Sequence, residues 1–160
     1  MSELKNFHVY KISEEFYNIT NWQEYNVHVK SERPNLVLLL EYEEYTDSVL
    51  CIPISKDDDK RRKYYRIMQR HPNNVHPLDF NQYDNYALIQ NAFFINKRFI
   101  DNPFTVNEVH VKVIDHNLQD DIMKKFRSLY AIYKSRGPLP IQVDYDIVYN
   151  IQNEYIYQNP

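Results

Sequence analysis

Apolar residues cluster along the first third of the chain in a pattern that predicts short strands and one helix. Phe7–Ile12 is rich in β-forming residues and predicts a first strand, and Ser13 followed by two glutamates marks a helix start. Asn35–Glu43, with a run of aliphatic residues, and Ser48–Ser55 are separated by a polar turn and predict a buried hairpin. Pro53 lacks an N–H, so the second strand should end, bulge or lie at an edge there.

The middle of the chain is more polar. Trp22–Glu32 predicts an ordered loop or a frayed element, and Asp57–Arg70 combines dense charge with helical periodicity. His71–Asp84 contains prolines, asparagines and histidines and predicts a loop. Tyr86–Ile95 and Val106–Ile114 predict two more strands, because the second of them alternates valines with polar residues.

A long amphipathic helix is predicted near the end of the chain. Leu118–Ser135 carries one apolar stripe, with Asp115 or Asn117 as its N-cap. Gly137 and the proline after it stop the helix, and Asp144–Tyr157 predicts a last short helix.

Locally paired strands with helices set apart predict the α+β class, in a single domain over residues 1–160. About five strands around one core favour a small, strongly twisted, barrel-like antiparallel sheet with flanking helices.

Composition excludes several classes of protein. Gly137 is the single glycine, so a P-loop or dinucleotide-binding loop is excluded, and Cys51 is the single cysteine, so an internal disulfide is excluded. The lone cysteine fits a reducing cytosol. The start of the chain lacks the apolar run of a signal peptide, and the longest apolar run is too short to cross a bilayer. We therefore expect a cytoplasmic protein without membrane contact.

Charge is distributed unevenly. The net charge is −3, but Lys60–Lys63 is entirely basic, and Arg66 and Arg70 follow at helical spacing. This stretch predicts either a solvated helix face or a nucleic-acid contact. The fifteen tyrosines can fill a core with a wet polar tip or stack on bases, and packing is the more common use.

Metal and carboxylate chemistry find little support. The spacing of His71 and His76 matches no compact zinc pattern, and His110 should face away from the valines toward solvent. The acidic runs Asp57–Asp59 and Asp120–Asp121 are typical of solvated faces or of the first turn of a helix. We expect no metal and no cofactor.

Cations and a hydroxyl converge at one end of the predicted hairpin. Lys30 and Arg33 precede its first strand, while Ser55 and Lys56 end its second strand, so an antiparallel pairing brings them to one edge, flanked by Lys60–Lys63. Such groups bind phosphate and stabilise its extra charge in a transition state. Attack of an RNA 2′-hydroxyl on its own phosphate needs alignment, proton transfer and charge stabilisation, all of which side chains can supply.

At these residues the chain resembles the ToxN/AbiQ family of type III toxin–antitoxin endoribonucleases, whose sheet is related to that of the MazF/Kid toxins. The resemblance is carried by short motifs in the same order along most of the chain. They are Tyr10–Ser13, Arg33–Leu40, Ile52–Lys56, Tyr86–Ile95 and Leu118–Arg136.

The resemblance implies a MazF/Kid-like fold and RNA cleavage that leaves a 2′,3′-cyclic phosphate without a metal. It also implies inhibition by a small structured RNA antitoxin in a cyclic protein–RNA assembly. Ser55 takes the place of the first hydroxyl of the family motif and Arg33 that of its basic residue. Tyr25 or His28 could serve for the family tyrosine. Lys56 departs from the family, which has a second hydroxyl there.

The hypothesis gives each candidate residue a role. Ser55 orients the phosphate, Arg33 and Lys56 stabilise its charge, and Lys30 or His71 moves protons. RNA-binding candidates are Tyr25, His28, Lys60, Arg61, Arg62, Lys63 and Arg66. Two alternatives stay open: a nucleic-acid-binding module without catalysis, and a protein-interaction protein that uses a tyrosine-rich surface.

Overall fold

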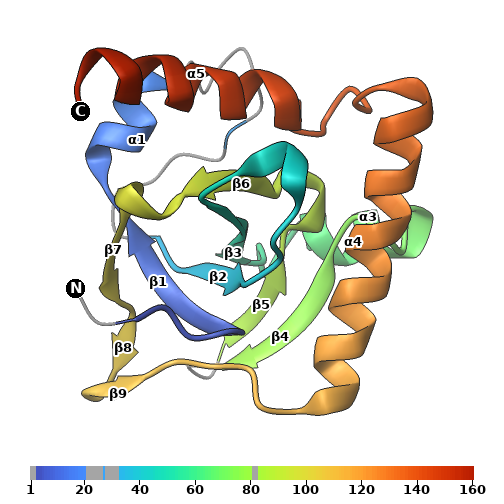
Figure 1. Cartoon of the computed structure of the whole chain (residues 1–160). Helices are drawn as coiled ribbons and strands as arrows, with labels where there is room; N and C mark the ends of the chain where they lie inside the picture. Colours follow the sequence, from blue (N-terminus) through green and yellow to red (C-terminus); the bar gives the residue numbers. More distant parts are fainter. Residues whose placement is uncertain (1–2, 21–26, 28–32, 81–82) are drawn as a thin grey trace.

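The computed structural model describes residues 3–20, 27, 33–80 and 83–160. Figure 1 shows a curled sheet with α5 across one end and α4 along one side. The strands are β1 (His8–Ile12), β2 (Asn35–Leu38), β3 (Ser48–Lys56), β4 (His76–Phe80), β5 (Tyr83–Ala87), β6 (Phe93–Asn96), β7 (Ile100–Pro103), β8 (Thr105–Val106) and β9 (Val109–His110). The α-helices are α1 (Glu14–Ile19), α3 (Lys63–Arg70), α4 (His116–Arg136) and α5 (Tyr145–Gln158), and the 3₁₀ turns are η1 (Glu43–Tyr45), η2 (Ile89–Asn91) and η3 (Lys97–Phe99).

The main sheet is antiparallel and is organised around β3. Its strand order is β4-β5-β3-β2-β1-β7, and β6 also pairs with β3. Within the described residues β4 and β7 are the two ends of this order, so the sheet is open rather than a closed barrel. The predicted α+β class with a twisted antiparallel sheet is confirmed, and only the barrel-like closure is absent.

One face of the sheet packs against α4. Alternate residues of β2 and β3, such as Leu36 and Ile52, are fully buried there together with Phe94 of β6. Phe126 and the other apolar residues of the α4 stripe cover them. Because the helix buries one stripe of its surface, its outer face is left to charged residues.

The other face packs against α1 and α5. Phe16 of α1 stacks on Phe93 of β6, with ring centres 4.9 Å apart. The buried Gln152 of α5 donates to the Phe94 carbonyl at 2.8 Å and accepts from the Asn96 N–H at 2.8 Å. These two bonds satisfy backbone groups of β6 where the sheet turns, which fixes α5 across the end of the sheet.

Several elements lie where the sequence predicts them. The first strand, the helix after Ser13, the long helix and the last helix are all present. Asp115 is the N-cap of α4 and accepts from the N–H groups of Asn117 and Leu118 at 2.8 and 3.2 Å. Gly137 adopts a φ of 84° at the other end, a conformation that favours glycine.

The prediction of one strand over Tyr86–Ile95 is wrong, because the segment turns at η2 and is shared between β5 and β6. The prediction of a loop over His71–Asp84 is also wrong, because it contains β4 and the start of β5. Pro77 pairs with Tyr86 in β4, which is at the end of the strand order. An edge strand tolerates proline, since the missing N–H can face away from the sheet.

The prediction of one strand over Val106–Ile114 is wrong as well. Thr105 pairs with His110 and Val106 with Val109, which leaves Asn107 and Glu108 as a two-residue turn with φ values of 52° and 65°. Two consecutive left-handed residues are typical of a type I′ hairpin turn. The alternation of valines concealed this turn, because it continues across it.

Pro53 neither ends β3 nor lies at an edge, and the strand expected over Asn35–Glu43 is shorter, ending at Leu38. On one side of β3, β6 pairs with Ser48–Cys51 and β5 with Ile54–Lys56, so Pro53 falls between two partners. Its carbonyl accepts from the Leu88 N–H at 2.8 Å. Proline is accommodated because its N position faces the gap where the partner strand changes.

No helix in the described ranges combines the length and apolar character needed to span a bilayer.

Candidate functional site

The start of β2 and the end of β3 meet at one edge of the sheet. Asn35 pairs with Pro53 in an antiparallel register, and the Ile54 N–H donates to the Pro34 carbonyl at 3.0 Å. Continuing this register places Arg33 opposite Ser55. Since directly opposed residues project to the same face, the predicted convergence of these two side chains follows from the observed pairing.

Arg33 is held in a half-buried position. Burial lowers its pKa, while the nearby tyrosines Tyr64 of α3 and Tyr17 of α1 act in the opposite direction. A guanidinium remains charged despite such a shift. Arg33 is therefore a fixed positive charge between two helices, and its partial burial strengthens its attraction for an anion.

Ser55 is half-buried beside Arg33, and its hydroxyl donates to the Lys56 carbonyl at 3.3 Å. On its other side Ser55 pairs with Tyr86 of β5. Lys56 is exposed, and strand alternation places it on the opposite face of β3 from Ser55. The register thus joins Arg33 with Ser55, and it does not by itself bring Lys56 to them.

Asp57 organises the chain after β3. It is buried, and its carboxylate accepts from the N–H groups of Tyr64 and Tyr65 at 2.9 and 3.1 Å. These are first-turn amides of α3, so Asp57 caps this helix from outside its own sequence neighbourhood. The prediction of a solvated acidic face is wrong for Asp57, because these backbone N–H groups would otherwise be buried without partners.

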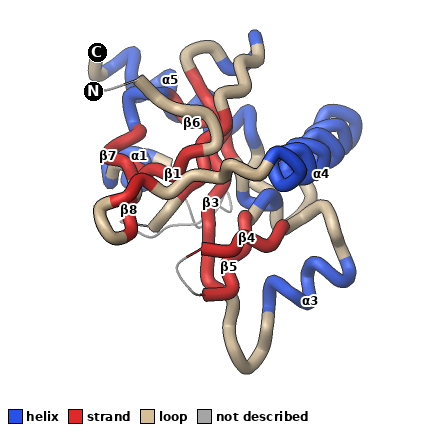
Figure 2. The backbone as a smooth tube through the Cα atoms, turned by 90° about the horizontal axis from the view of Figure 1, so that it is seen from below, coloured by secondary structure: helices blue, strands red, loops and turns tan. Residues whose placement is uncertain are grey.

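The basic segment forms a turn that leads into α3. Asp58 accepts from the N–H groups of Lys60 and Arg61 at 2.8 and 3.1 Å, and these bonds lower the pKa of its carboxyl group. Arg62 adopts a left-handed conformation, and its guanidinium carbon lies 3.9 Å from the ring centre of Tyr65. Figure 2 shows this loop projecting from the sheet before α3 begins.

All five basic candidates of this region are exposed: Lys60, Arg61, Arg62, Lys63 and Arg66. The Lys63 ammonium lies 5.5 Å from the ring centre of Tyr64, and Tyr64 in turn acts on Arg33. The structure therefore links the basic segment to the Arg33–Ser55 edge through one buried tyrosine.

His71 lies away from this edge. It is exposed and follows the last residue of α3, where its N–H donates to the Ile67 carbonyl at 2.7 Å. The eight residues of α3 separate it from the basic turn by about 12 Å. The structure does not bring His71 to Ser55. Lys30, Tyr25 and His28 lie outside the described residues.

Three polar residues at the edge were not singled out from the sequence. The side chain of Tyr17 has its hydroxyl buried without a hydrogen-bond partner in the described part of the chain, as does the Oδ1 atom of Asn35. Burial raises the pKa of Tyr17, with Asn35 and Arg33 opposing this effect. Tyr64 is the third. No local pattern marks these residues, because α1 and α3 meet β2 only in the folded chain.

His110 is half-buried, with an Nε2 atom 2.8 Å from the Val9 carbonyl, so the prediction of a plain surface histidine is incomplete. Across the described residues, no three His, Cys, Asp or Glu side chains are grouped so that they could hold a metal ion.

No protein-family model matches the chain, and no curated protein matches it. A solved structure does: "Structure and activity of AbiQ, a lactococcal anti-phage endoribonuclease belonging to the type-III toxin-antitoxin system". The match has a TM-score of 0.69 at 13% sequence identity and covers 98% of this chain and 100% of AbiQ. The resemblance read from the short motifs is thus confirmed at the level of the fold, and the chain has the fold of AbiQ over almost its whole length.

Proposed function

We propose that this protein is a cytoplasmic endoribonuclease toxin of a type III toxin–antitoxin system that acts in phage defence. The single observation that carries the proposal is the pairing of Arg33 with Ser55 at one sheet edge, in a chain with the fold of an anti-phage endoribonuclease. The exposed basic turn beside this edge supports RNA as the substrate, because cations arranged along a surface attract the phosphate backbone.

The proposed reaction is attack of an RNA 2′-hydroxyl on the adjacent phosphate, which leaves a 2′,3′-cyclic phosphate. The 2′-oxygen forms a bond to phosphorus and the bond to the 5′-oxygen breaks. Arg33 stabilises the negative charge that develops on the phosphate oxygens, and the Ser55 hydroxyl orients one of them. The attacking 2′-hydroxyl loses its proton to a base and the departing oxygen gains one from an acid. Lys30 and His71 remain candidates for these two steps.

A small structured RNA antitoxin is proposed as the inhibitor. It would occupy the same edge and the basic turn of Lys60–Lys63, and copies of protein and RNA would alternate in a ring. The charge of the turn supports this part of the proposal, since a folded RNA presents closely spaced phosphates.

The first experiment is cleavage of cellular RNA by purified protein in excess EDTA, compared with a Ser55→Ala/Arg33→Gln variant. We expect the parent alone to produce fragments that end in a cyclic phosphate. Ser128→Ala/Arg136→Gln is the matched control, because it removes the same groups from exposed positions of α4. Intact RNA with a folded parent protein that nevertheless binds RNA would leave a binding module as the function.

A further inference from the structure

Two histidines are packed together away from the Arg33–Ser55 edge. His8 of β1 and His110 of β9 lie with ring centres 4.8 Å apart, and His110 also contacts the ring of Tyr10 at 5.0 Å. The rings meet edge to face, with interplanar angles of 67° and 81°. The pair is therefore a built arrangement held by β1 and β9.

Each ring has one nitrogen committed to the backbone. The Nδ1 atom of His8 lies 2.9 Å from the Asn6 carbonyl, and the Nε2 atom of His110 lies 2.8 Å from the Val9 carbonyl. A carbonyl only accepts, so both of these ring nitrogens carry the proton and donate. The second nitrogen of each neutral ring is left as an acceptor. Protonation converts it into a charged N–H donor without disturbing the first bond.

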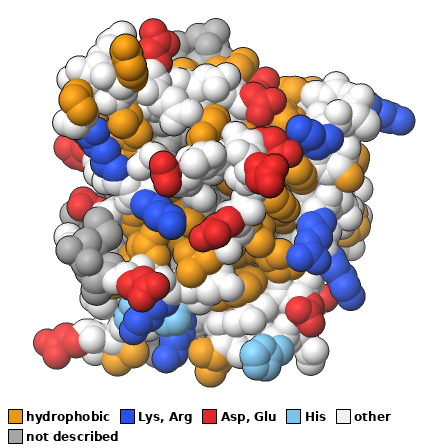
Figure 3. All heavy atoms as spheres, in the orientation of Figure 1, with side chains coloured by type: hydrophobic (Ala, Val, Ile, Leu, Met, Phe, Trp, Pro, Cys, Tyr) orange, Lys and Arg blue, Asp and Glu red, His pale blue; other side chains and the backbone are white. Residues whose placement is uncertain are grey.

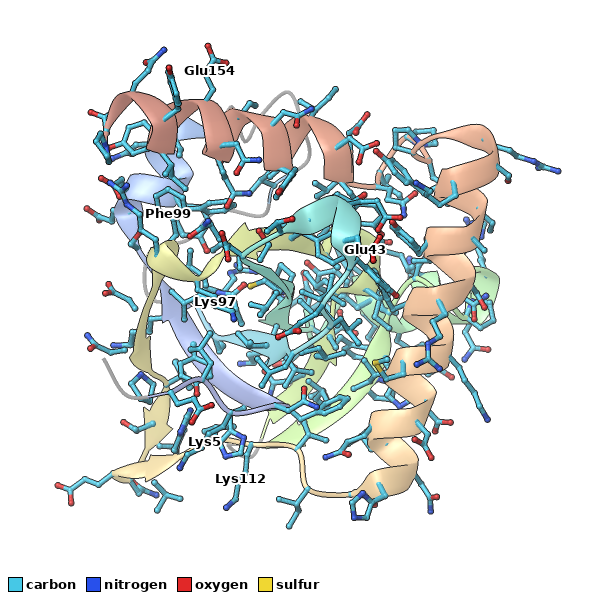
Figure 4. The ribbon with its side chains drawn as sticks, in the orientation of Figure 1. Lys5, Glu43, Lys97, Phe99, Lys112 and Glu154 are labelled. Carbon is cyan, nitrogen blue, oxygen red and sulfur yellow. The ribbon has the colours of Figure 1, made fainter. Side chains whose placement is uncertain are left out.

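Two lysines flank the pair. Lys112 forms an antiparallel bridge with His8 and lies two residues after His110, so all three project to one side of the extended backbone. The Lys5 N–H donates to the Tyr10 hydroxyl at 2.9 Å, which holds the start of the chain beside the rings. Figure 4 shows Lys5 and Lys112 near each other below the start of β1, and Figure 3 shows histidine atoms beside lysine atoms there.

The electrostatic environment of His110 is positive. Burial lowers its pKa most, and His8, Lys5 and Lys112 lower it further, against the opposing effect of the bond to the Val9 carbonyl. Carboxylates of the neighbouring segments are all exposed. They are Glu3 before the strand, Asp101 on β7 and Glu108 in the β8–β9 turn. The ring nitrogens thus lie among cations, an environment that favours an incoming anion.

This group shares a sheet face with the candidate cleavage site. His8 pairs with Val37, and Arg33 lies four residues before Val37 on the same strand. Alternation places Val37 and Arg33 on one face, and His8 joins them across the pairing. Four residues of extended strand span roughly 13 Å, so one RNA strand could reach both groups.

We propose that Lys5, His8, His110 and Lys112 form a second phosphate-binding patch that holds the backbone of a bound RNA away from the cleavage site, more tightly in mild acid than at neutral pH. The inference rests on the proposed function for its ligand. RNA is favoured as the occupant because the patch offers dispersed cations and outward ring nitrogens. These match a row of phosphates and leave the bases unread.

The test measures affinity for an uncleavable single-stranded 2′-O-methyl RNA of mixed sequence at several salt concentrations. Lys5→Gln/Lys112→Gln should weaken binding about tenfold. It should also reduce the slope of log affinity against log salt by about one. Lys97→Gln/Lys124→Gln carries the same charge change at exposed positions elsewhere and should leave both nearly unchanged. With cleavable RNA, the patch variant should raise KM while kcat at saturation stays that of the parent.

The acid dependence has its own variant. His8→Gln/His110→Gln keeps an N–H for each backbone carbonyl and removes the titrating ring. The parent should bind more tightly at about pH 5.5 than at about pH 7.5, and this gain should disappear in the histidine variant while persisting in His116→Gln. Equal affinity and salt slope for parent and lysine variant would overturn the patch, even if cleavage is observed. Equally tight binding of polyglutamate would overturn RNA as its occupant. Absence of any RNA binding by the folded parent would instead overturn the proposed function.

Discussion

The tyrosines between α4 and α5 differ from the tyrosine at the Arg33 edge in what their hydroxyl groups contact. Tyr45 donates to Asp146 at 2.8 Å, Tyr133 donates to Asp144 at 2.7 Å, and Tyr145 accepts from Gln142 at 2.9 Å. Tyr17, by contrast, is buried with no hydrogen-bond partner for its hydroxyl in the described part of the chain. Both regions use tyrosine as an aromatic core residue, and they differ in whether its polar end is satisfied.

The difference separates structural from functional use of one residue type. A buried hydroxyl without a partner costs about 1–3 kcal/mol, so a chain selected for stability alone would place phenylalanine there. Of the buried side-chain atoms without a partner in the described residues, Tyr17 and Asn35 both adjoin Arg33. We interpret this concentration as polarity retained for a bound phosphate and its counter-charge.

The largest effect is expected from the satisfied region. Phe126 is fully buried beneath α4 and contacts Phe94 with ring centres 6.1 Å apart. Phe126→Ala should lower the free energy of unfolding by about 3–5 kcal/mol, because it removes a large side chain and leaves a cavity. Urea denaturation measures this loss. RNA cleavage per folded molecule should not change, and a selective loss of cleavage would contradict the division between the two regions.

At the unsatisfied edge, Arg33→Gln should act mainly on activity. Loss of a positioned charge should slow cleavage about 100- to 1000-fold. The free energy of unfolding should fall by less than about 1 kcal/mol, since half-buried Arg33 offsets its pairing against its desolvation. Single-turnover kinetics on a fluorescent RNA and urea denaturation give the two numbers. A normal cleavage rate would remove Arg33 from the site.

A matched pair of hydroxyl deletions tests the comparison directly. Tyr133→Phe should cost about 1–2 kcal/mol of stability, because it breaks the bond to Asp144 and strands the Asp146 N–H that Tyr133 accepts at 3.1 Å. Tyr17→Phe should leave stability unchanged or slightly raised and should lower the cleavage rate. Thermal denaturation and cleavage assays on both variants decide the matter. The reverse ranking in stability would show that Tyr17 is the structural residue.

The smallest effect concerns His76, the buried unpartnered group on the α4 side. Burial, and secondarily Lys125, lower its pKa to about 4, while Asp121 acts in the opposite direction. Since the unfolded chain binds a proton near pH 6.5 and the folded chain does not, stability should fall as pH drops from about 6.5 toward 4. His76→Gln should reduce this fall, seen as a smaller drop in Tm between neutral and acidic buffer. An unchanged drop would assign it to other groups.

Prediction from the sequence succeeded where one segment carries its own signals. Asp115 and Gly137 mark the ends of α4 by local chemistry, and the aliphatic runs of β2 and β3 announce a buried hairpin. That hairpin alone places Arg33 opposite Ser55, because an antiparallel register is fixed once two strands pair. These parts of the fold and of the candidate site needed no long-range information.

Tertiary structure decided the rest. Whether β3 continues past Pro53 depends on β5 and β6 sharing one side of it, and neither neighbour is adjacent in sequence. Burial of Asp57 as the cap of α3, and the placement of Tyr17 and Tyr64 around Arg33, likewise depend on which elements meet in space. Local periodicity reports which face of a segment is apolar, and it says nothing of the partner that covers this face. The sequence therefore determined the strands and charges of the edge, while packing of distant segments decided which polar groups surround it.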